Sequence, residues 1–363
     1  MTVAVLVASN NQVSETFVRR HIDMLGSNCI VIYGGSTPFK MDGYVPSMAH
    51  KLAYRAKKVM GIASDYYDYT LAHLLKSNNV RCCFAEFGPI GVGALNACEQ
   101  LGIDLIVHFH GYDAFKYDTL SEFSEKYLNL FTFAKMVISV STAMSQQLRE
   151  LGCPGDKIKY LPCLPDDNFG NGHYKNEGKS LLAVGRFVEK KAPWLTILAF
   201  NKVLVNHPDA SLIMVGDGPL LPVCISLCES LKIKNVTFMG PKPHEEVVQL
   251  MLSTTIFVQH SIIASDGDRE GTPVSVSEAM IAGIPVVSTK HQGIDDIIEN
   301  EETGILVEEN DIDGMAAAIE SLLKDENKRS RLSVNSKKAM AELKSSLNES
   351  AFFQAIVDGR YIQ

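Results

Sequence analysis

Short apolar runs alternate with amphipathic stretches along the whole chain. A short, continuous apolar run is typical of a buried strand, whereas apolar residues that recur every three or four positions are typical of a helix. Regular alternation of the two patterns predicts parallel sheets whose strands are joined by helical crossovers. We therefore predict an α/β protein with two doubly wound sheets, one in each half of the chain.

Each half of the chain has its own series of predicted elements. The strands expected in the first half cover residues 3–8, 29–33, 81–87, 104–110, 136–140 and 158–163. The helices expected between them cover residues 14–25, 49–62, 66–77, 91–101, 121–134 and 142–151. The strands expected in the second half cover residues 180–185, 211–215, 236–239, 256–259, 285–288 and 305–307. Its helices are expected near residues 192–206, 219–231, 243–253, 273–282, 293–299 and 312–323.

A run of turn-forming residues at 165–172 separates the two series and predicts a linker. We expect an N-terminal domain over residues 1–168 and a C-terminal domain over residues 177–346. A terminal helix at 347–363 is expected to pack back on the first domain. Open α/β sheets bind ligands beyond the carboxyl ends of their strands, so we expect a ligand site in a cleft between the two domains.

Composition narrows the class of protein. The 363 residues are 46% hydrophobic and 21% charged, which is enough for two domains with separate cores. The formal charge of −8 argues against general nucleic-acid binding, which depends on a basic surface. The eight cysteines lack paired C-x-x-C spacing and indicate reduced core residues in a cytoplasmic protein. The apolar run at residues 3–8 is too short to span a membrane.

Two carboxylates, Glu270 and Glu278, flank a predicted helix start. Thr272 is a suitable N-cap, Pro273 suits the first helical position, and Gly283 ends the helix. The free N–H groups and the positive dipole end of such a helix attract a phosphate. The second carboxylate would lie about 9 Å further along the axis, at about 1.5 Å per residue. This spacing suits a nucleotide sugar, with one carboxylate on the sugar hydroxyls and the other on the ribose. Taken alone, the second carboxylate also fits an exposed polar stripe on the helix.

Two cations follow the first predicted strand of the second half, which ends at Gly185. Arg186 and Lys191 lie five positions apart in this loop. A diphosphate leaving group gains negative charge as it departs, and an Arg together with a Lys stabilises that charge without a metal ion. The alternative is a solvated surface loop with ordinary charges.

Two histidines and a carboxylate gather at the end of a predicted strand in the first half. His108 and His110 share one face of the strand because side chains alternate, and Asp113 follows closely. The group resembles a metal site, but no third ligand has suitable spacing. The alternatives are a hydrogen-bonded core pair, or a neutral His110 that bonds a sugar hydroxyl while Asp113 orients the loop.

Other segments also resemble known motifs. Residues 266–268 have the sequence Asp-Gly-Asp, which resembles a metal-binding loop. We expect a loop at the edge of the cleft instead. There Asp268 would contact the acceptor, or the segment would cap Arg269. The glycine-rich segments 88–93 and 215–219 lack the spacing of a dinucleotide-binding fingerprint. A dehydrogenase is therefore disfavoured.

The predicted helix at 49–62 carries three cations on one face, Lys51, Arg55 and Lys58, and a tyrosine-rich segment at 66–69 follows it. Such a helix either rests on anionic lipid or is an ordinary solvated helix.

Several of these motifs together resemble the family 4 glycosyltransferases of the GT-B fold, in which two Rossmann-like domains face a central cleft. The likeness spans nearly the whole chain and is closest to bacterial members that build capsular, exopolysaccharide or lipopolysaccharide chains. The residues that carry it are Ser14-Glu15-Thr16-Phe17, His110-Gly111-Tyr112-Asp113, Gly185-Arg186-Phe187 with Lys191, Glu270-Gly271-Thr272-Pro273 with Glu278, and Thr303-Gly304-Ile305-Leu306-Val307.

The resemblance implies a retaining, metal-independent transfer of a hexose from a UDP- or GDP-linked sugar to a hydroxyl of a glycan or lipid-linked acceptor. The first domain would be on the acceptor side, and the second would bind the nucleotide sugar. No cofactor or nucleic-acid partner is implied, and the protein would work in the cytoplasm, at the inner face of the membrane. A non-catalytic nucleotide-sugar-binding protein and a GT-B sugar epimerase are the alternatives.

The resemblance also assigns roles to residues. Glu270 would hold the donor sugar, Glu278 the ribose, and His110 the sugar on the reaction face. The diphosphate would be bound by Arg186, Lys191 and the backbone N–H groups of Gly271 and Thr272. Gly185 and Pro273 would also belong to the nucleotide-binding site. The acceptor side would include Glu15, Thr16, Asp113 and Asp268.

The sequence departs from the family pattern at three places. Ala192 replaces a common glycine, residues 295–296 replace a common Pro-Glu pair, and residues 9–12 replace a Gly-Gly loop. Contacts made by that loop in relatives are therefore not transferable to this chain.

Overall fold

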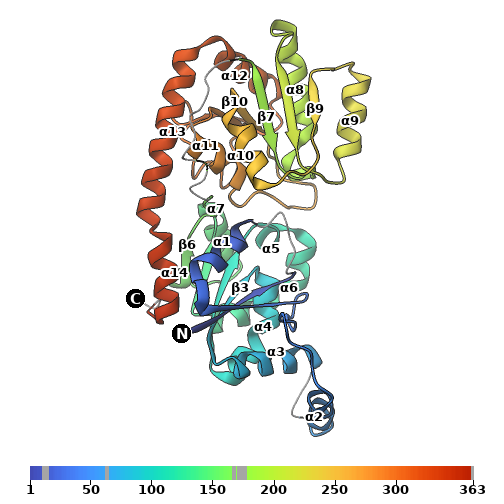
Figure 1. Ribbon diagram of the computed structural model, residues 1–363, viewed down its shortest axis with the longest axis vertical. Helices are drawn as coiled ribbons and strands as arrows, with labels where there is room; N and C mark the ends of the chain where they lie inside the picture. The colour runs from blue at the N-terminus through green and yellow to red at the C-terminus, as the bar shows by residue number, and fades with distance from the viewer. Residues whose placement is uncertain (10–15, 62–64, 166–168, 170–177, 361–363) are drawn as a thin grey trace. The chain divides into compact units, whose positions relative to one another are not determined.

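The computed structural model describes residues 1–9, 16–61, 65–165, 169 and 178–360. The chain divides into two compact units, one formed by Met1–Leu161 with Asn348–Gln363 and one by Pro162–Leu347 (Figure 1). Each unit contains a six-stranded sheet in which the paired strands run parallel. The prediction of two doubly wound α/β sheets is therefore confirmed. Most of the predicted linker at 165–172 lies outside the described residues.

The sheet of the first unit has the strand order β2-β1-β3-β4-β5-β6. The strands are β1 (Thr2–Val7), β2 (Cys29–Tyr33), β3 (Val80–Glu86), β4 (Asp104–Phe109), β5 (Met136–Ser139) and β6 (Ile158–Tyr160). The helices are α1 (Thr16–Leu25), α2 (Met48–Val59), α3 (Tyr66–Ser77), α4 (Gly88–Leu101), α5 (Tyr112–Phe115), α6 (Tyr117–Phe133), α7 (Thr142–Glu150) and α14 (Glu349–Asp358). The central strands β1, β3 and β4 are almost wholly buried, which explains their continuous apolar runs.

The sheet of the second unit has the strand order β12-β11-β10-β7-β8-β9. The strands are β7 (Ser180–Val184), β8 (Ser211–Val215), β9 (Val236–Phe238), β10 (Ile256–Gln259), β11 (Val286–Thr289) and β12 (Ile305–Val307). The helices are α8 (Pro193–Asn206), α9 (Leu221–Ser230), α10 (His244–Leu252), α11 (Val274–Ala282), α12 (Ile312–Lys324) and α13 (Glu326–Leu347). Because β7, β10, β11 and β12 are neighbours, their carboxyl ends lie along one edge of the sheet.

Helix α14 belongs to the first unit although it lies at the far end of the sequence. The Met1 amino group donates a hydrogen bond to the Val357 carbonyl at 2.8 Å. Arg20 of α1 donates to the Glu349 carboxylate at 2.8 Å, and both side chains are largely buried. These contacts hold the helix against α1 and the first strand.

Two helix predictions differ from the structure. The helix expected at 293–299 is wrong, because this segment forms hydrogen-bonded turns. Gly293 has a φ of +81°, a conformation that interrupts a right-handed helix. The long helix α13 was not predicted, because it is polar over most of its surface and buries only a narrow stripe formed by Arg329, Leu332, Ser336 and Met340.

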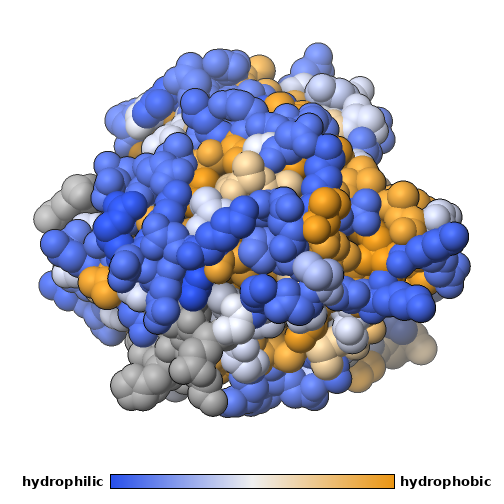
Figure 2. Space-filling view, turned by 90° about the horizontal axis from the view of Figure 1, so that it is seen from above, coloured by the Kyte–Doolittle hydropathy of each residue, from blue (hydrophilic) through white to orange (hydrophobic). Residues whose placement is uncertain are grey.

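The surface seen in Figure 2 is mostly hydrophilic, and its hydrophobic residues gather in patches. Among the described residues, exposed large apolar side chains occur on several helices, including Val205 on α8 and Val223 on α9. The helix α2 carries three of them, Met48, Leu52 and Val59. In the part of the chain that the structure describes, no helix is long and apolar enough to cross a membrane.

Candidate functional site

An ion pair joins two predicted site residues in the second unit. Lys191 Nζ lies 3.1 Å from Glu270 Oε2, and both side chains are largely buried. Lys191 ends a short 3₁₀ turn after β7, whereas Glu270 lies in the loop before α11. Burial alone would raise the pKa of Glu270, but the charges of Lys191 and Lys190 lower it below its ordinary value. Burial lowers the pKa of Lys191, and the neighbouring carboxylate opposes that shift.

One oxygen of the Glu270 carboxylate is suited to accept hydrogen bonds from a ligand. Its Oε1 atom is buried and has no hydrogen-bond partner among the described residues. A buried carboxylate oxygen without a partner costs free energy, so such an atom is expected to meet a ligand. Hydroxyl groups are the natural partners because they donate hydrogen bonds.

Gln259, at the end of β10, links the ion pair to α11. Lys191 Nζ donates to Gln259 Oε1 at 3.4 Å. The Ser275 hydroxyl, in the first turn of α11, donates to the same oxygen at 3.0 Å. The amide nitrogen of Gln259 donates in turn to Ser261 Oγ at 3.0 Å. The lysine is therefore held from two sides and keeps its position beside the helix start.

His291 holds the backbone of Glu270 and was missed at the sequence level. The Glu270 N–H donates to His291 Nε2 at 3.1 Å, and His291 Nδ1 lies 2.5 Å from Glu309 Oε1. The carboxylate orients the ring so that Nε2 accepts a hydrogen bond. His291 follows β11 and Glu309 follows β12, so both lie beyond the strand ends at the same sheet edge. Polar residues directly after two predicted strands were the available signal.

The loop after β7 presents the second predicted cation. Arg186 is exposed and its guanidinium makes no ion pair with a described residue. Arg186, Lys191 and Gly185 line one small cavity together with Gln259. A Cβ atom on Gly185 would lie 3.4 Å from Lys191 Cε, so the glycine leaves the lysine its space. The arrangement offers an exposed cation and a buried one to an anion.

Ala192, which replaces a common glycine of the family, has a backbone conformation that glycine adopts easily. Ala192 adopts a left-handed conformation, with φ +37° and ψ +52°, at the N-cap of α8. Glycine adopts this conformation without the steric cost that a Cβ atom brings. The alanine therefore keeps the backbone path that a glycine would take, and no charged group of the site changes.

Helix α11 begins one residue later than predicted. Pro273, not Thr272, occupies the N-cap position, and no side chain caps the helix. The first N–H groups of a helix have no intrahelical partner and can bind an anion. The loop before the helix is tightly packed, because a Cβ atom on Gly293 would lie 1.4 Å from the Gly271 carbonyl oxygen. The left-handed Gly293 thus sets the path of the residues that carry Glu270.

Glu278 lies inside the second unit rather than on its surface. The residue is only 6% exposed and is surrounded on α11 by buried Val276, Ala279 and Met280. The interpretation of Glu278 as part of an exposed polar stripe is therefore wrong. A buried carboxylate on so apolar a helix requires polar partners.

The Asp-Gly-Asp segment stabilises the loop that contains it. Asp268 Oδ1 lies 3.0 Å from Lys190 Nζ, and Asp266 Oδ1 accepts a hydrogen bond from the Asp268 N–H at 3.0 Å. Lys190 also donates to the Arg269 carbonyl at 3.2 Å. These contacts fix the loop that leads to Glu270.

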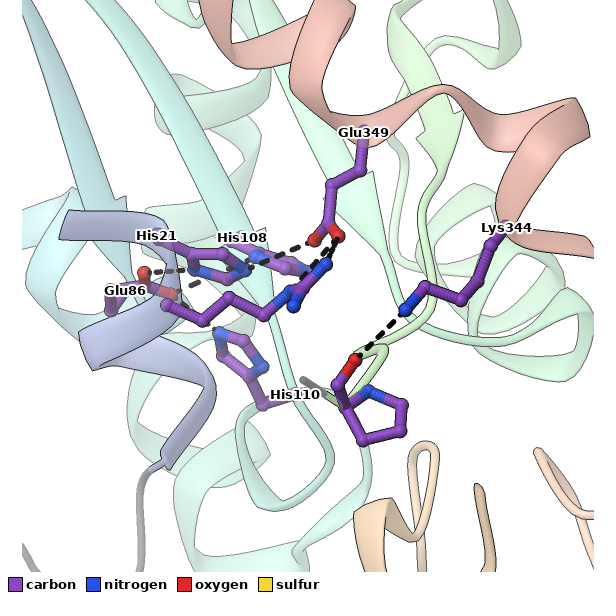
Figure 3. A network of polar contacts seen from close by, with 8 residues as sticks. His21, Glu86, His108, His110, Lys344 and Glu349 are labelled. Atoms are coloured by element: carbon purple, nitrogen blue, oxygen red, sulfur yellow. Dashed lines mark hydrogen bonds and ion pairs between the residues drawn. The ribbon is translucent and has the colours of Figure 1, made fainter. Parts of the chain in front are cut away.

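The buried carboxylate of Glu86 contacts His110 and His21 in the first unit (Figure 3). Glu86 is fully buried, and its two carboxylate oxygens are hydrogen-bonded to different rings. Oε1 lies 2.7 Å from His21 Nδ1, and Oε2 lies 2.7 Å from His110 Nε2. Burial would raise the pKa of Glu86, but the charge of His21 and the hydrogen bonds from both rings lower it well below its ordinary value. Sequence reasoning missed Glu86, although it is a polar residue near the end of the strand predicted at 81–87.

His108 lies beside this group in the sheet. It is directly opposite Glu86 in the pairing of β3 with β4, and its ring is fully buried. Burial lowers the pKa of His108 well below its ordinary value, so the ring is neutral. The ligand atoms of His21, Glu86 and His108 lie within 4.8 Å of one another. The 2.7 Å contacts of Glu86 are hydrogen bonds, and they engage both carboxylate oxygens.

Asp113 organises the loop around His110. Its carboxylate accepts hydrogen bonds from the N–H groups of Gly88, His110 and Gly111 at 2.9–3.0 Å. Burial raises the pKa of Asp113, and the three N–H groups oppose that rise. The carboxylate thereby joins the start of α4 to the loop after β4.

The predicted residues are distributed over both units. His110 and Asp113 belong to the first unit, and the cations and carboxylates discussed above belong to the second. Glu15 lies outside the described residues, and Thr16 is the first residue of α1. A cavity of about 640 Å³ in the first unit contains none of the predicted residues, because it lies where β4 begins.

Comparisons with known proteins identify the family. Residues 166–339 match the family described as glycosyl transferases group 1, and residues 63–168 match glycosyltransferase family 4. The putative colanic acid biosynthesis glycosyltransferase WcaL of Salmonella typhimurium is 34% identical over 65% of this chain. The amylovoran biosynthesis glycosyltransferase AmsK of Erwinia amylovora is 30% identical over 64% of this chain. This chain spans 59% of the length of each of these two relatives.

Solved structures agree in fold. The structure of HepE from Anabaena in complex with UDP and glucose has a TM-score of 0.76 at 17% identity, over 97% of this chain and 98% of HepE. Sucrose-phosphate synthase from Thermosynechococcus elongatus has a TM-score of 0.75 at 18% identity, over 99% of each chain. With the two parallel sheets and the two family matches, these similarities show that the chain belongs to the family 4 glycosyltransferases of the GT-B fold.

Proposed function

We propose that the protein is a glycosyltransferase of exopolysaccharide biosynthesis that moves a hexose from a nucleoside diphosphate sugar to a hydroxyl of a glycan or lipid-linked acceptor. The names of the WcaL and AmsK relatives support the pathway class. UDP and glucose bound to HepE support a nucleotide-sugar donor. The donor base of this chain is uridine or guanosine.

The observation that carries the proposal is the buried Lys191–Glu270 ion pair beside the start of α11. The lysine and the exposed Arg186 would bind the diphosphate together with the first N–H groups of the helix. The unpartnered oxygen of Glu270 would accept hydrogen bonds from the donor-sugar hydroxyls. Glu278, on the same helix, would bind the ribose.

We propose that transfer proceeds with retention and without a metal ion. The bond between the sugar C1 and the diphosphate oxygen breaks, and its electron pair leaves with the phosphate. The acceptor oxygen bonds to C1 on the same face, and its proton passes to the departing phosphate oxygen. The charge that develops on the phosphate is stabilised by Arg186 and Lys191, which supply the role that a divalent cation would otherwise have.

His110 would bind the sugar on the reaction face, with its ring held by Glu86. The 2.7 Å hydrogen bond between Nε2 and the carboxylate fixes the orientation of the ring. Asp113 and Asp268 would lie on the acceptor side. The protein would act at the inner face of the membrane if its acceptor is lipid-linked.

Product analysis tests the proposal. Purified protein is incubated with UDP- and GDP-hexoses and an acceptor glycan, with and without a chelator. We expect a glycosylated product of retained anomeric configuration, undiminished by the chelator, and at least a hundredfold slower transfer by Glu270→Gln and Arg186→Ala. The exposed Glu299→Gln serves as the control.

Two other outcomes would replace the proposal. Nucleotide binding without transfer to any acceptor would indicate a non-catalytic binding protein. An isomerised nucleotide sugar would indicate an epimerase. Full turnover by both site variants would remove the basis of the proposed donor site.

A further inference from the structure

Among the residues that the structure describes, helix α2 contacts its unit along one side only. His50 is buried, and its Nε2 lies 3.2 Å from Thr70 Oγ1 of α3. The Tyr54 ring lies 5.1 Å from the Tyr66 ring, and the Lys57 ammonium lies 5.2 Å from the centre of the Tyr69 ring. Residues 50, 54 and 57 share one face of a helix because they are three or four positions apart. This single stripe holds the helix against α3.

The opposite stripe of α2 is apolar and exposed. Met48 is 72% exposed, Leu52 is 56% exposed and Val59 is 89% exposed. At 100° per residue these three positions lie opposite the stripe that contacts α3. The residues that flank the helix continue the pattern, since Val45 is 84% exposed and Met60 is 62% exposed. Exposed apolar residues gathered on one helix face indicate an interaction surface.

Cations lie beside this apolar stripe. All three cations, Lys51, Arg55 and Lys58, flank it on one side, and Arg55 lies nearest to it. Residues 43–61 contain no Asp or Glu, although the chain as a whole carries a formal charge of −8. The surface is therefore both apolar and positive, and an anionic partner with an apolar interior complements it.

We infer that α2 binds the surface of an anionic lipid membrane. Met48, Leu52 and Val59 enter the boundary between headgroups and acyl chains, and Lys51, Arg55 and Lys58 contact the headgroup phosphates. The long aliphatic stems of the cations allow their charged ends to reach the headgroups while the apolar stripe is buried. The helix lies in the plane of the membrane surface and does not cross it.

The structure also identifies the side chains that carry this contact. Two of the tyrosines that follow α2, Tyr66 and Tyr69, do not form the lipid-facing surface, because they pack against Tyr54 and His50. A second copy of the chain fits the surface less well than lipid, since two α2 faces would bring their own Lys51, Arg55 and Lys58 together. Like charges at close range disfavour that pairing.

Vesicle binding tests the inference without any sugar donor, so its outcome does not depend on the proposed function. The full chain is sedimented with vesicles of phosphatidylcholine and phosphatidylglycerol at a 7:3 ratio, and with vesicles of phosphatidylcholine alone. We expect binding to the anionic vesicles that weakens as salt is raised from 50 to 500 mM. Binding to the neutral vesicles should be at least tenfold weaker.

Matched variants locate the surface. The double variant Leu52→Glu with Val59→Glu should lower the partition coefficient at least tenfold. The control Val205→Glu with Val334→Glu changes two side chains that are 80% and 68% exposed elsewhere, and it should bind as the wild type does. Circular dichroism checks that each variant is folded.

Two charge-neutralising variants separate the contribution of the cations to vesicle binding from that of the apolar stripe. The triple variant Lys51→Gln, Arg55→Gln and Lys58→Gln should bind at least fivefold less and lose most of the salt dependence. The triple variant Lys76→Gln, Lys232→Gln and Lys234→Gln removes the same charge elsewhere and serves as the control. Equal loss in both series would overturn the inference. A wild-type dimer in light scattering that dissociates in the Leu52→Glu, Val59→Glu variant would assign the surface to self-association instead.

Discussion

The Glu86 carboxylate accepts a hydrogen bond from His110 Nε2 at 2.7 Å and thereby fixes the orientation and the tautomer of the His110 ring. His110 is the residue proposed to contact the sugar, and Glu86 lies fully buried beneath it. The carboxylate is shared with His21 on α1, so the position of a loop histidine depends on a helix and on the neighbouring strand. The relationship makes Glu86 a positioning residue for the proposed reaction.

Replacing Glu86 with glutamine should weaken the first unit. The Glu86→Gln variant removes a buried charge that two histidine rings contact, and breaking such a pair costs about 3 kcal/mol. Urea unfolding followed by circular dichroism measures this change, with the exposed Glu125→Gln as the control. Transfer by folded Glu86→Gln should shift in its pH profile, because the tautomer of His110 is no longer set. A variant as stable as the control would contradict the role of Glu86.

Removing the charge of Lys191 should reduce transfer more than it reduces stability. Lys191→Met loses the contact with Glu270 and the proposed contact with the diphosphate, and loss of one such group slows transfer by about 10²–10³. Initial rates at saturating donor measure the effect, and the exposed Lys290→Met is the control.

A double-mutant cycle with Glu270→Gln then tests the ion pair itself. The two side chains are in contact, so we expect their effects on stability to be non-additive. Additive effects would show that the pair is not coupled in solution.

Substitution of Gly293 should displace the loop that carries Glu270. In Gly293→Ala the new Cβ would lie 1.4 Å from the Gly271 carbonyl oxygen, and φ is +81°. Gly35→Ala is the matched control, because Gly35 has φ +87° and nothing within 4 Å of its added Cβ. The control isolates the conformational cost of about 1–2 kcal/mol for a left-handed alanine.

We expect Gly293→Ala to lose at least 1 kcal/mol more than this control, and to bind the nucleotide sugar at least tenfold more weakly. Thermal unfolding and calorimetric titration measure the two effects. Equal losses in both variants would mean that the loop absorbs the clash.

The second unit should lose stability as the pH falls from about 6.5 to about 4. Burial lowers the pKa of His260 from 6.5 to about 4, although the charges of Glu309 and Asp311 oppose the shift. The His260 Nε2 atom accepts a hydrogen bond from the Asn310 N–H at 3.0 Å, as a neutral ring can. Between these values the unfolded chain binds a proton that the folded chain does not, so the free energy of unfolding decreases by up to about 3 kcal/mol. Above pH 6.5 this contribution is constant.

The variant His260→Asn isolates this group. Its free energy of unfolding should fall less steeply over the same pH range, although its stability at pH 7 is also reduced. Denaturant titrations at half-unit pH steps provide the comparison. Parallel curves for the wild type and the variant would show that His260 titrates normally in the fold.

Local patterns in the sequence were sufficient for the strands and for most helices. Apolar runs such as residues 3–8 and 104–110 predict buried strands, because a strand with apolar side chains on both faces is stable only where both faces are buried. The same reasoning failed for α13, whose surface is mostly polar, and for residues 293–299, where a left-handed glycine interrupts an apparent helix. Glu270 and Glu278 were recognised because they lie close together in the chain.

Only the tertiary structure decided which distant side chains meet. Gly185, Gln259, His291 and Glu309 come from four strand ends that are far apart in sequence, and parallel pairing places those ends along one sheet edge. Periodicity describes neighbours along the chain and carries no information about register between strands. The contacts of Lys191 with Glu270 and of Glu86 with His110 arise from that register, and so does the burial of Glu86 and Glu270.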